Sequence, residues 1–341
     1  MTKPSATGPS SDEGPPPSSA ANWLVCPWTA SALEKIQPVL ARLSAAEDLQ
    51  LQLIARELVE RGGKRLRPAL VFLSSRFGQC DEDRLLRVAA ALELLHVASL
   101  YHDDVIDRAP LRRRAESVNA RWGNTLASLG GTYLFARASA VLASLADDVN
   151  RLTGDAMVTL CDGEVQEVSN AYDLDLSERE HLAILARKTG TLFALPCRVG
   201  AALGEVGAPV ADALAVYGRN LGLAFQLIDD ALDVTGAAAE TGKAEGTDLR
   251  EGVYGLSLLR ALQRRDAAAR QIRATLEQIS LSEGEVQRVL SLVRESGVVE
   301  SVLQTAREFA AQARRALDIL PAGEAKESLD RLTAYAVSRS T

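Results

Sequence analysis

The chain has 341 residues, of which 47% are hydrophobic and 24% are charged. This composition is typical of a globular protein and excludes a wholly disordered, collagenous or coiled-coil chain. Its net charge of −7 argues against non-specific binding of nucleic acid. No stretch of roughly 18 apolar residues lacks a charge, so we expect no membrane-spanning helix. Four scattered cysteines and a start without a signal-peptide pattern lead us to expect a cytoplasmic protein.

Residues 1–21 differ in composition from the rest of the chain. They hold five of the 12 prolines and five serines, with almost nothing apolar to bury. Residues 22–341 are poor in proline and rich in Ala, Leu, Arg and Glu, which are good helix formers. No Gly/Ser-rich or charged linker divides them. We therefore expect a disordered tail at 1–21 and a single domain over 22–341.

The pattern after the tail predicts helices. Apolar residues recur at intervals of three and four, as at Leu85, Val88, Leu92 and Leu95, and no clear alternation of period two is visible. Residues 177–180 match a helix-capping box. Other expected helix starts and stops are Gly62-Gly63, Asp81, Gly204 and Gly207. The fold class indicated is all-α.

Two aspartate clusters follow long apolar helical patterns. They are Asp103-Asp104-Val105-Ile106-Asp107 and Asp229-Asp230-Ala231-Leu232-Asp233. Aspartates four residues apart share a helix face and repel one another, a cost from which a purely structural helix gains nothing. Mg²⁺ prefers such carboxylate oxygens and binds them together with substrate phosphates. A solvated helix end is the alternative for one cluster, but two clusters in apolar settings favour a metal site.

Basic residues supply partners for an anion. Residues 62–68 carry three cations after a glycine turn, and Arg112-Arg113-Arg114 follows the first aspartate cluster. Arginine binds phosphate bidentately, whereas lysine acts as a point charge. His96 lies seven residues before Asp103, on the same helix face. Each basic run alone is more often a solvated loop, but beside an acidic cluster the two runs favour a diphosphate site.

In this order, the motifs resemble those of the trans-isoprenyl diphosphate synthases, or polyprenyl synthetases, over nearly all of residues 31–341. The segments that carry the resemblance are Gly62-Gly63-Lys64-Arg65-Leu66-Arg67-Pro68, Glu93-Leu94-Leu95-His96, both aspartate clusters, Arg112-Arg113, Lys188-Thr189, Phe225-Gln226, Gly242-Lys243, Asp248-Leu249-Arg250-Glu251-Gly252 and Tyr335-Ala336-Val337-Ser338-Arg339. The resemblance implies a single-domain helical bundle with a central substrate cavity, usually a homodimer. It also implies head-to-tail condensation of isopentenyl diphosphate with an allylic diphosphate through Mg²⁺-assisted ionisation.

The resemblance further implies roles for individual residues. The residues that would hold three Mg²⁺ ions on the allylic diphosphate are Asp103, Asp107 and Asp229. The acids that would support them are Asp104, Asp230 and Asp233. The allylic diphosphate would be bound by Arg112, Lys188 and Lys243, and isopentenyl diphosphate by Lys64, Arg67, His96 and Arg113. Thr189 and Gln226 would line the reacting end.

Departures from the family pattern concern one edge of the expected site. Val253 stands where family members often have lysine, and Gly255-Leu256-Ser257 stands where they have Thr-Leu-Pro. The change at Val253 would leave one cation fewer for the allylic diphosphate. Arg250 is a candidate to compensate for this loss.

Product length depends on the residues one helical turn before the first aspartate cluster. Ala98 and Ser99 are small there, so they would leave the path of the growing chain open, and phenylalanine at either position should shorten the product. We expect a product of C20 or longer and favour C30 or longer. In the alternative, Ala98 and Ser99 only pack the helix, and Tyr133 or Phe135 forms the floor of the path.

Two other function classes stay open at this point. A non-catalytic or regulatory subunit of a heteromeric prenyl synthase would account for Val253. A class I terpene cyclase shares the ionisation chemistry, but it usually lacks a second aspartate cluster of this kind and the Gly-Gly-Lys-Arg segment. The synthase is favoured, and its lipid product would bring the protein into transient contact with a membrane surface.

Overall fold

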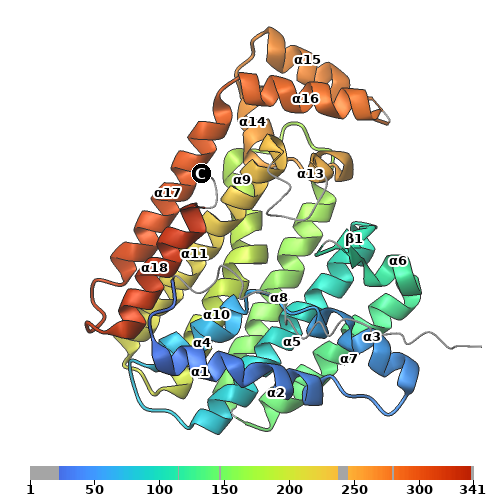
Figure 1. Cartoon of the computed structure of the whole chain (residues 1–341). Helices are drawn as coiled ribbons and strands as arrows, with labels where there is room; N and C mark the ends of the chain where they lie inside the picture. The colour runs from blue at the N-terminus through green and yellow to red at the C-terminus, as the bar shows by residue number, and fades with distance from the viewer. Residues whose placement is uncertain (1–22, 114, 146, 237–244, 279, 339–341) are drawn as a thin grey trace, which may run out of the picture.

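The computed structural model describes residues 23–113, 115–145, 147–236, 245–278 and 280–338. Over these residues the chain is almost entirely helical, which confirms the all-α fold class (Figure 1). The predicted tail at 1–21 and Lys243 lie outside the described residues. In chain order the elements are α1 (Pro27–Glu34), α2 (Ile36–Leu43), α3 (Leu49–Glu60), α4 (Leu66–Ser75), α5 (Glu82–Ile106), β1 (Leu111–Arg112), β2 (Ala115–Glu116), α6 (Val118–Trp122), α7 (Asn124–Ala143), α8 (Asp147–Ser169), α9 (Glu178–Leu185), the π-helical turn η2 (Ala186–Gly190), α10 (Thr191–Leu203), α11 (Ala208–Thr235), α13 (Thr247–Glu251), α14 (Leu256–Gln263), α15 (Ala267–Leu276), α16 (Glu283–Glu295), α17 (Val298–Ala316) and α18 (Glu324–Ser338).

Long helices dominate the architecture (Figure 1). α5 packs against α4 and α7, and α11 packs against α10 and α17. A separate apolar cluster around Ile272, Val286 and Leu290 holds α14, α15 and α16 together at the top of Figure 1. α5 and α11 therefore have fixed neighbours on several sides, which makes them a rigid support for side chains near their ends.

Local sequence signals set the helix ends as predicted. The Asp81 carboxylate accepts hydrogen bonds from the backbone N–H groups of Asp83 and Arg84 at the start of α5. Ser177 and Glu180 form a complete capping box before α9. α3 ends just before Gly62, whose φ of 73° lies in the left-handed region that favours glycine.

A short antiparallel hairpin departs from the purely helical prediction. Leu111 pairs with Glu116 and Arg112 pairs with Ala115 in strands of two residues each. Strands this short cannot show an alternating apolar pattern, so no local signal predicts them. The hairpin matters because it carries Arg112 and Arg113 at its tip.

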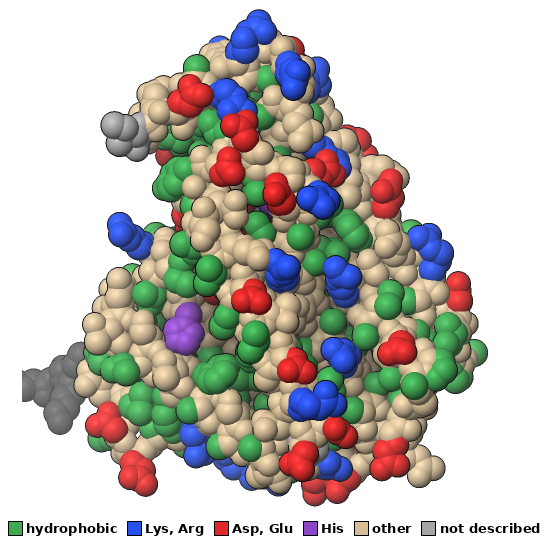
Figure 2. Space-filling model, turned by 180° about the vertical axis from the view of Figure 1, so that it is seen from behind, with side chains coloured by type: hydrophobic (Ala, Val, Ile, Leu, Met, Phe, Trp, Pro, Cys, Tyr) green, Lys and Arg blue, Asp and Glu red, His purple; other side chains and the backbone are tan. Residues whose placement is uncertain are grey.

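Among the described residues, α5 and α7 are long and apolar enough to cross a membrane by length and composition alone, so the expectation of no membrane-spanning helix stays a prediction. The apolar window of α5 is 67% buried inside the protein, whereas that of α7 is only 33% buried. This test is weak evidence, because core helices also pass it. Hydrophobic side chains gather in the lower half of the molecule seen from behind (Figure 2).

Candidate active site

A cavity of about 560 Å³ lies among α4, α5, α8, η2, α11 and the hairpin. The predicted site residues in its wall are Lys64, Arg67, His96, Ser99, Asp103, Asp107, Arg112, Arg113, Lys188, Thr189, Gln226, Asp229, Asp230 and Asp233. Two further predicted residues, Ala98 and Asp104, do not belong to this wall. Lys243 lies outside the described residues, so its role stays a prediction.

The two aspartate clusters come together on the acidic side of the cavity. Asp103 lies in the last turn of α5 and Asp107 is the residue that follows this helix. Asp229 and Asp233 lie in the last two turns of α11. A helix C-terminus carries partial negative charge, so carboxylates there are unfavourable unless a cation is near. Both helices therefore direct excess negative charge into the same space.

Burial makes this excess of negative charge more costly. It raises the pKa of Asp103 to about 7; the Lys188 ammonium opposes the shift, and Glu164 adds to it. The pKa of Asp230 is raised well above its usual range, first by burial and then by Asp248. Buried carboxyls that are costly to ionise are stabilised in the ionised form by a bound cation.

The oxygen donors of this acidic side fit Mg²⁺. Among the described residues, no three His, Cys, Asp or Glu side chains converge closely enough to hold a metal ion by themselves. Mg²⁺ usually takes one or two carboxylates and completes its shell with waters and substrate phosphates. The arrangement therefore suits a metal that binds together with a diphosphate.

The raised pKa of Asp103 predicts pH-dependent metal binding. Below pH 7 this carboxyl is largely protonated, and Mg²⁺ must displace its proton. Mg²⁺ affinity should therefore rise from pH 6 to pH 8, by up to about tenfold for the one proton displaced. Calorimetric titration with Mg²⁺ and inorganic diphosphate at both pH values measures this. Asp103→Asn should remove most of the dependence, and an unchanged affinity in the unmodified protein would contradict the assignment.

Basic side chains form the opposite side of the cavity. Lys64 precedes α4, Arg67 lies in its first turn, and Arg113 comes from the hairpin, whose Arg112 lies beside the acidic side. The Arg67 guanidinium lies 5.2 Å from the centre of the Phe193 ring, and the Lys64 ammonium lies 5.2 Å from that of Tyr335. Such cation–π contacts hold the two cations in place without neutralising them.

His96 lies among these arginines on the cavity side of α5. Burial, and then the charges of Arg67, Arg113 and Arg112, lower its pKa well below the usual value. The imidazole is therefore neutral and can donate one hydrogen bond. The His96 Nδ1 and Arg67 Nε atoms are buried without a hydrogen-bond partner among the described residues. Two unsatisfied buried groups in a cationic pocket are what an anionic ligand would satisfy.

Asp104 and Arg112 form a buried ion pair that corrects one expectation. Asp104 was expected to support the metal ions, but its side chain is fully buried outside the cavity wall. Its Oδ1 atom accepts a hydrogen bond from Arg112 Nε at 2.7 Å. Adjacent helical residues point about 100° apart, so Asp103 faces the cavity while Asp104 faces the hairpin. Asp104 thus orients Arg112 rather than reaching the ligand.

Arg113 is fixed against the glycine turn that precedes α4. Its guanidinium donates hydrogen bonds to the carbonyls of Gly62 and Leu58. A Cβ atom on Gly63 would lie 3.1 Å from Arg113 Nη2, and the φ of Gly63 is 147°. Glycine is therefore required at position 63 both for the backbone conformation and for the close approach of Arg113.

The π-helical turn η2 presents Lys188 and Thr189 to the cavity. Lys188 Nζ lies 2.9 Å from Glu164 and also pairs with Glu167, both on α8. Gly163 permits this approach, because a Cβ there would lie 2.9 Å from the Lys188 backbone nitrogen. Single π-helical turns occur often at functional sites.

Thr189 begins a short chain of hydrogen bonds across the cavity. Its Oγ1 atom donates to Gln226 Oε1 at 2.9 Å, and Gln226 Nε2 donates to Asp230 Oδ1 at 2.9 Å. His181 Nε2 lies 4.0 Å from the other Asp230 oxygen. The second aspartate cluster is therefore linked to η2 by hydrogen bonds, and the neutral His181 of α9 lies near it without hydrogen-bonding to it.

Sequence reasoning did not assign several residues of this wall. Glu164 and Glu167 lie one helical turn apart on α8, and both face Lys188. His181 lies in the wall with its pKa lowered by burial to about 4, so it is neutral. Glu164 belongs to the pair Gly163-Glu164, which matches the family pattern in the sequence although no site role was assigned to it, whereas His181 stands alone in an amphipathic helix and gives no local signal.

Ser99 lines the cavity, whereas Ala98 does not. Ala98 is 1% exposed and belongs to the apolar core around α5. The expectation that both project into the path of the product is therefore wrong for Ala98. Phe135 is 40% exposed, which argues against it as a floor, and the Tyr133 hydroxyl donates to the Ala45 carbonyl.

Arg250 does not replace the missing lysine at Val253. Val253 itself lies in the cavity wall. The Arg250 guanidinium instead binds both Glu283 carboxylate oxygens at 2.8 Å and the Glu245 carbonyl at 2.6 Å, and it is absent from the wall. Since α13 turns Arg250 toward α16, the suggested compensation is wrong.

An all-α fold whose cavity sets two aspartate clusters against a group of arginines defines a class of enzymes that bind diphosphates together with divalent metals. The polyprenyl synthetase family model matches residues 49–293 of this chain. A heptaprenyl diphosphate synthase component 2 from Geobacillus stearothermophilus is 35% identical over 306 residues, covering 89% of this chain and 94% of that protein. A nonaprenyl diphosphate synthase from Mycobacterium tuberculosis is 36% identical over 283 residues, or 83% and 84% of the two chains.

Solved structures agree with the family match. A polyprenyl synthase from Caulobacter crescentus, complexed with calcium and isoprenyl diphosphate, has a TM-score of 0.86 and 33% identity, covering 92% of this chain and 97% of its own. A decaprenyl diphosphate synthase from Rhodobacter capsulatus has a TM-score of 0.84 and 30% identity, covering 92% and 98%. The chain belongs to the polyprenyl synthetase family and is a prenyltransferase. These relatives do not favour the regulatory-subunit or cyclase alternatives.

Proposed function

We propose that this chain condenses isopentenyl diphosphate with an allylic diphosphate, head to tail, and repeats the step to a product of C30 or longer. The proposal rests on one observation: an acidic side and a cationic side face each other across one cavity. Two diphosphates can then lie side by side, one held through metal ions and the other by cations directly. Relatives named as heptaprenyl, nonaprenyl and decaprenyl diphosphate synthases support the long product.

We assign the allylic diphosphate to the acidic side. Asp103, Asp107 and Asp229 would hold three Mg²⁺ ions. The solved structure of a relative with calcium and isoprenyl diphosphate supports the use of a divalent metal. The metal would supply positive charge where the departing diphosphate gains negative charge. Arg112 and Lys188 add fixed positive charge at the same place. Lys188 would exchange its carboxylate partners on α8 for diphosphate oxygens.

Isopentenyl diphosphate is assigned to the cationic side. Lys64, Arg67 and Arg113 supply charged donors, and neutral His96 supplies one more hydrogen bond. Thr189 and Gln226 lie between the two sites and orient the reacting ends. Breaking the allylic C–O bond releases diphosphate with the bonding electron pair and leaves a carbocation that the isopentenyl double bond attacks. The released diphosphate then accepts the proton that is lost. Leu100, Leu192 and Phe225 in the wall exclude water that would quench the cation.

Ser99 provides a test of the product length. Ser99→Phe should place a ring in the cavity below Asp103 and shorten the product, because Ser99 lines this space. Ala98→Phe should lower stability by about 1–3 kcal/mol instead, because Ala98 is packed in the core. Mass spectrometry of the products and thermal unfolding measure the two effects. An unchanged product from folded Ser99→Phe would contradict an open path past this residue.

We further propose a homodimer that covers the apolar surface of α7 and α8. These neighbouring helices expose Leu129 and Phe135 on α7 and Val158, Val165 and Val168 on α8. The α8 residues recur with helical spacing along one stripe, as expected for a helix that packs against another. Sedimentation of the purified chain tests this assembly. The relative named component 2 makes a heteromeric partner the competing outcome.

The working environment follows from these proposals. We place the enzyme in the cytoplasm, where its free cysteines stay reduced. Its product is a long hydrocarbon, so release would involve transient contact with a membrane surface.

The proposed function is tested with the purified chain, Mg²⁺, labelled isopentenyl diphosphate and a panel of allylic primers. Mass spectrometry should find elongated diphosphates. Cyclic hydrocarbons would indicate a cyclase. Turnover that requires an added partner would indicate one subunit of a heteromeric synthase.

A further inference from the structure

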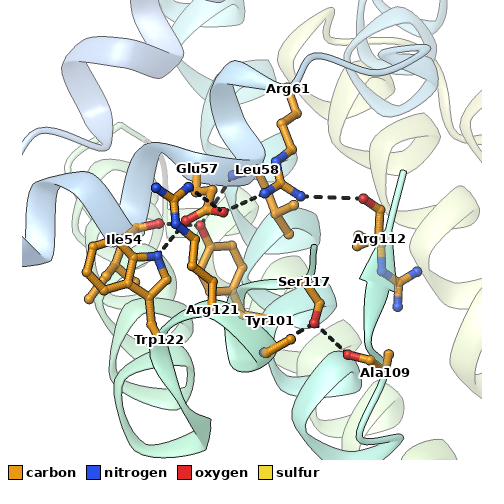
Figure 3. Close-up of polar contacts among 11 residues, drawn as sticks. Ile54, Glu57, Leu58, Arg61, Tyr101, Ala109, Arg112, Ser117, Arg121 and Trp122 are labelled. Carbon is orange, nitrogen blue, oxygen red and sulfur yellow. Dashed lines mark hydrogen bonds and ion pairs between the residues drawn. The ribbon is translucent and has the colours of Figure 1, made fainter. Parts of the chain in front are cut away.

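A carboxylate outside the cavity wall, that of Glu57, receives hydrogen bonds from the end of α3 and from α6 (Figure 3). Glu57 on α3 is not part of the wall, and its side chain is only 7% exposed. It accepts hydrogen bonds from Arg61 Nη2 at 2.5 Å and Trp122 Nε1 at 2.6 Å, and a longer one from Arg121 Nη1 at 3.4 Å. One carboxylate therefore joins the end of α3 to α6.

The bonds of Glu57 continue into the hairpin. Arg61 uses its other terminal nitrogen, Nη1, to donate to the Arg112 carbonyl at 3.4 Å (Figure 3). α6 follows the hairpin directly, and the Ser117 hydroxyl both caps α6 and donates to the Ala109 carbonyl at 2.5 Å. Glu57 thus reaches the hairpin at its tip through Arg61 and at its base through α6.

The glycine turn at Gly62 is also hydrogen-bonded to this hairpin, through Arg113. Arg113 donates to the carbonyls of Leu58 and Gly62, at the end of α3 and just beyond it. α3 is in turn held on α5 by the Tyr101 hydroxyl, which donates to the Ile54 carbonyl at 2.5 Å. The end of α3 is therefore the common support of two cationic segments, residues 62–67 and residues 112–113.

We propose that Glu57 is a positioning residue for the diphosphate site on the cationic side. Both segments carry arginines, whose mutual repulsion is offset in part by Glu93, the partner of Arg65, and their spacing has to match a diphosphate. Glu57 fixes Arg61 and α6 and so sets this spacing before the ligand binds, which reduces the cost of ordering the cations on binding. The inference rests on the proposed function, since it assigns a diphosphate to these cations.

Glu57→Gln tests the proposal with little change of shape. The neutral amide accepts weaker hydrogen bonds from arginine, and its NH₂ group faces donors. The dissociation constant for inorganic diphosphate and the KM for isopentenyl diphosphate should rise about tenfold, since a charge-assisted hydrogen bond is weakened. kcat at saturating substrate should change much less. Trp122 fluorescence should also shift, because its indole N–H loses a charged partner.

Glu60→Gln is the matched control. Glu60 lies on the same helix, its side chain is 59% exposed, and its distance to Arg56 is 3.9 Å. It should leave both binding constants unchanged. If Glu57→Gln fails to fold, Trp122→Phe removes one of the three bonds, keeps an aromatic ring, and should still weaken diphosphate binding measurably.

Each possible result supports or overturns the role proposed for Glu57. Normal diphosphate binding and normal KM in folded Glu57→Gln, even with a lower melting temperature, would reduce Glu57 to a structural residue and overturn it. Normal binding in both Glu57→Gln and Trp122→Phe would do the same. Failure of the unmodified protein to bind inorganic diphosphate or to elongate primers would instead reject the proposed function.

Discussion

Replacing Asp103 or Asp229 with alanine should lower kcat/KM by about 10³-fold or more, corresponding to about 4 kcal/mol of lost transition-state stabilisation. Each carboxylate lies near the end of a helix on the acidic side of the cavity, where Mg²⁺ would offset the charge of the departing diphosphate. Steady-state assays with saturating isopentenyl diphosphate measure the effect. Both variants should also need more Mg²⁺ for half-maximal activity.

Asp83→Ala is the control for these two variants. Asp83 is an exposed acid in the first turn of α5, at the opposite end of the helix that carries Asp103. Its removal should leave turnover unchanged. Near-normal turnover of folded Asp103→Ala or Asp229→Ala would reject the assignment of the metal to these aspartates.

Arg67→Met should raise the KM for isopentenyl diphosphate by about 10- to 150-fold, because a hydrogen bond to a charged group contributes about 1.5–3 kcal/mol. Arg67 is half-buried, and desolvation is the main cause that lowers its pKa to about 10, so it carries its charge at neutral pH. Methionine keeps the contact with Phe193 and removes only the charged donors. The KM for the allylic primer should change little, because Arg67 lies on the cationic side.

An exposed arginine on α5 provides the comparison for Arg67. Arg87→Met removes the same charge at a solvent-exposed position and should leave both KM values unchanged. Equal increases of both KM values in Arg67→Met would contradict the separation of the two diphosphates across the cavity.

Much of the fold could be predicted because its signals are local. Helical periodicity, the caps at Asp81 and Ser177, and the glycine after α3 each act within a few residues, so sequence spacing suffices to place them. The two-residue strands could not be predicted, because strands this short cannot show an alternating apolar pattern.

The candidate site divides in the same way. Spacing within one helix placed Asp103 and His96 on a common face, and both line the cavity. Sequence spacing could not decide which of two adjacent residues faces the cavity, so Asp104 and Ala98 were assigned to a cavity that they do not reach. Arg250 was misassigned for a related reason, since Glu283, its actual partner, lies far along the chain.

The sequence by itself determined the helical class and the presence of carboxylates and cations suited to diphosphates, because these follow from composition and short-range spacing. The family was indicated by the resemblance of its motifs, in their order along the chain, to those of known members. Only the tertiary structure decided which charges share a cavity and which stabilise one another. Coulombic attraction and burial depend on distances between segments far apart in the chain. The fold brings Lys188 to Glu164 on α8, Arg112 to Asp104, and Glu57 to Trp122 on α6.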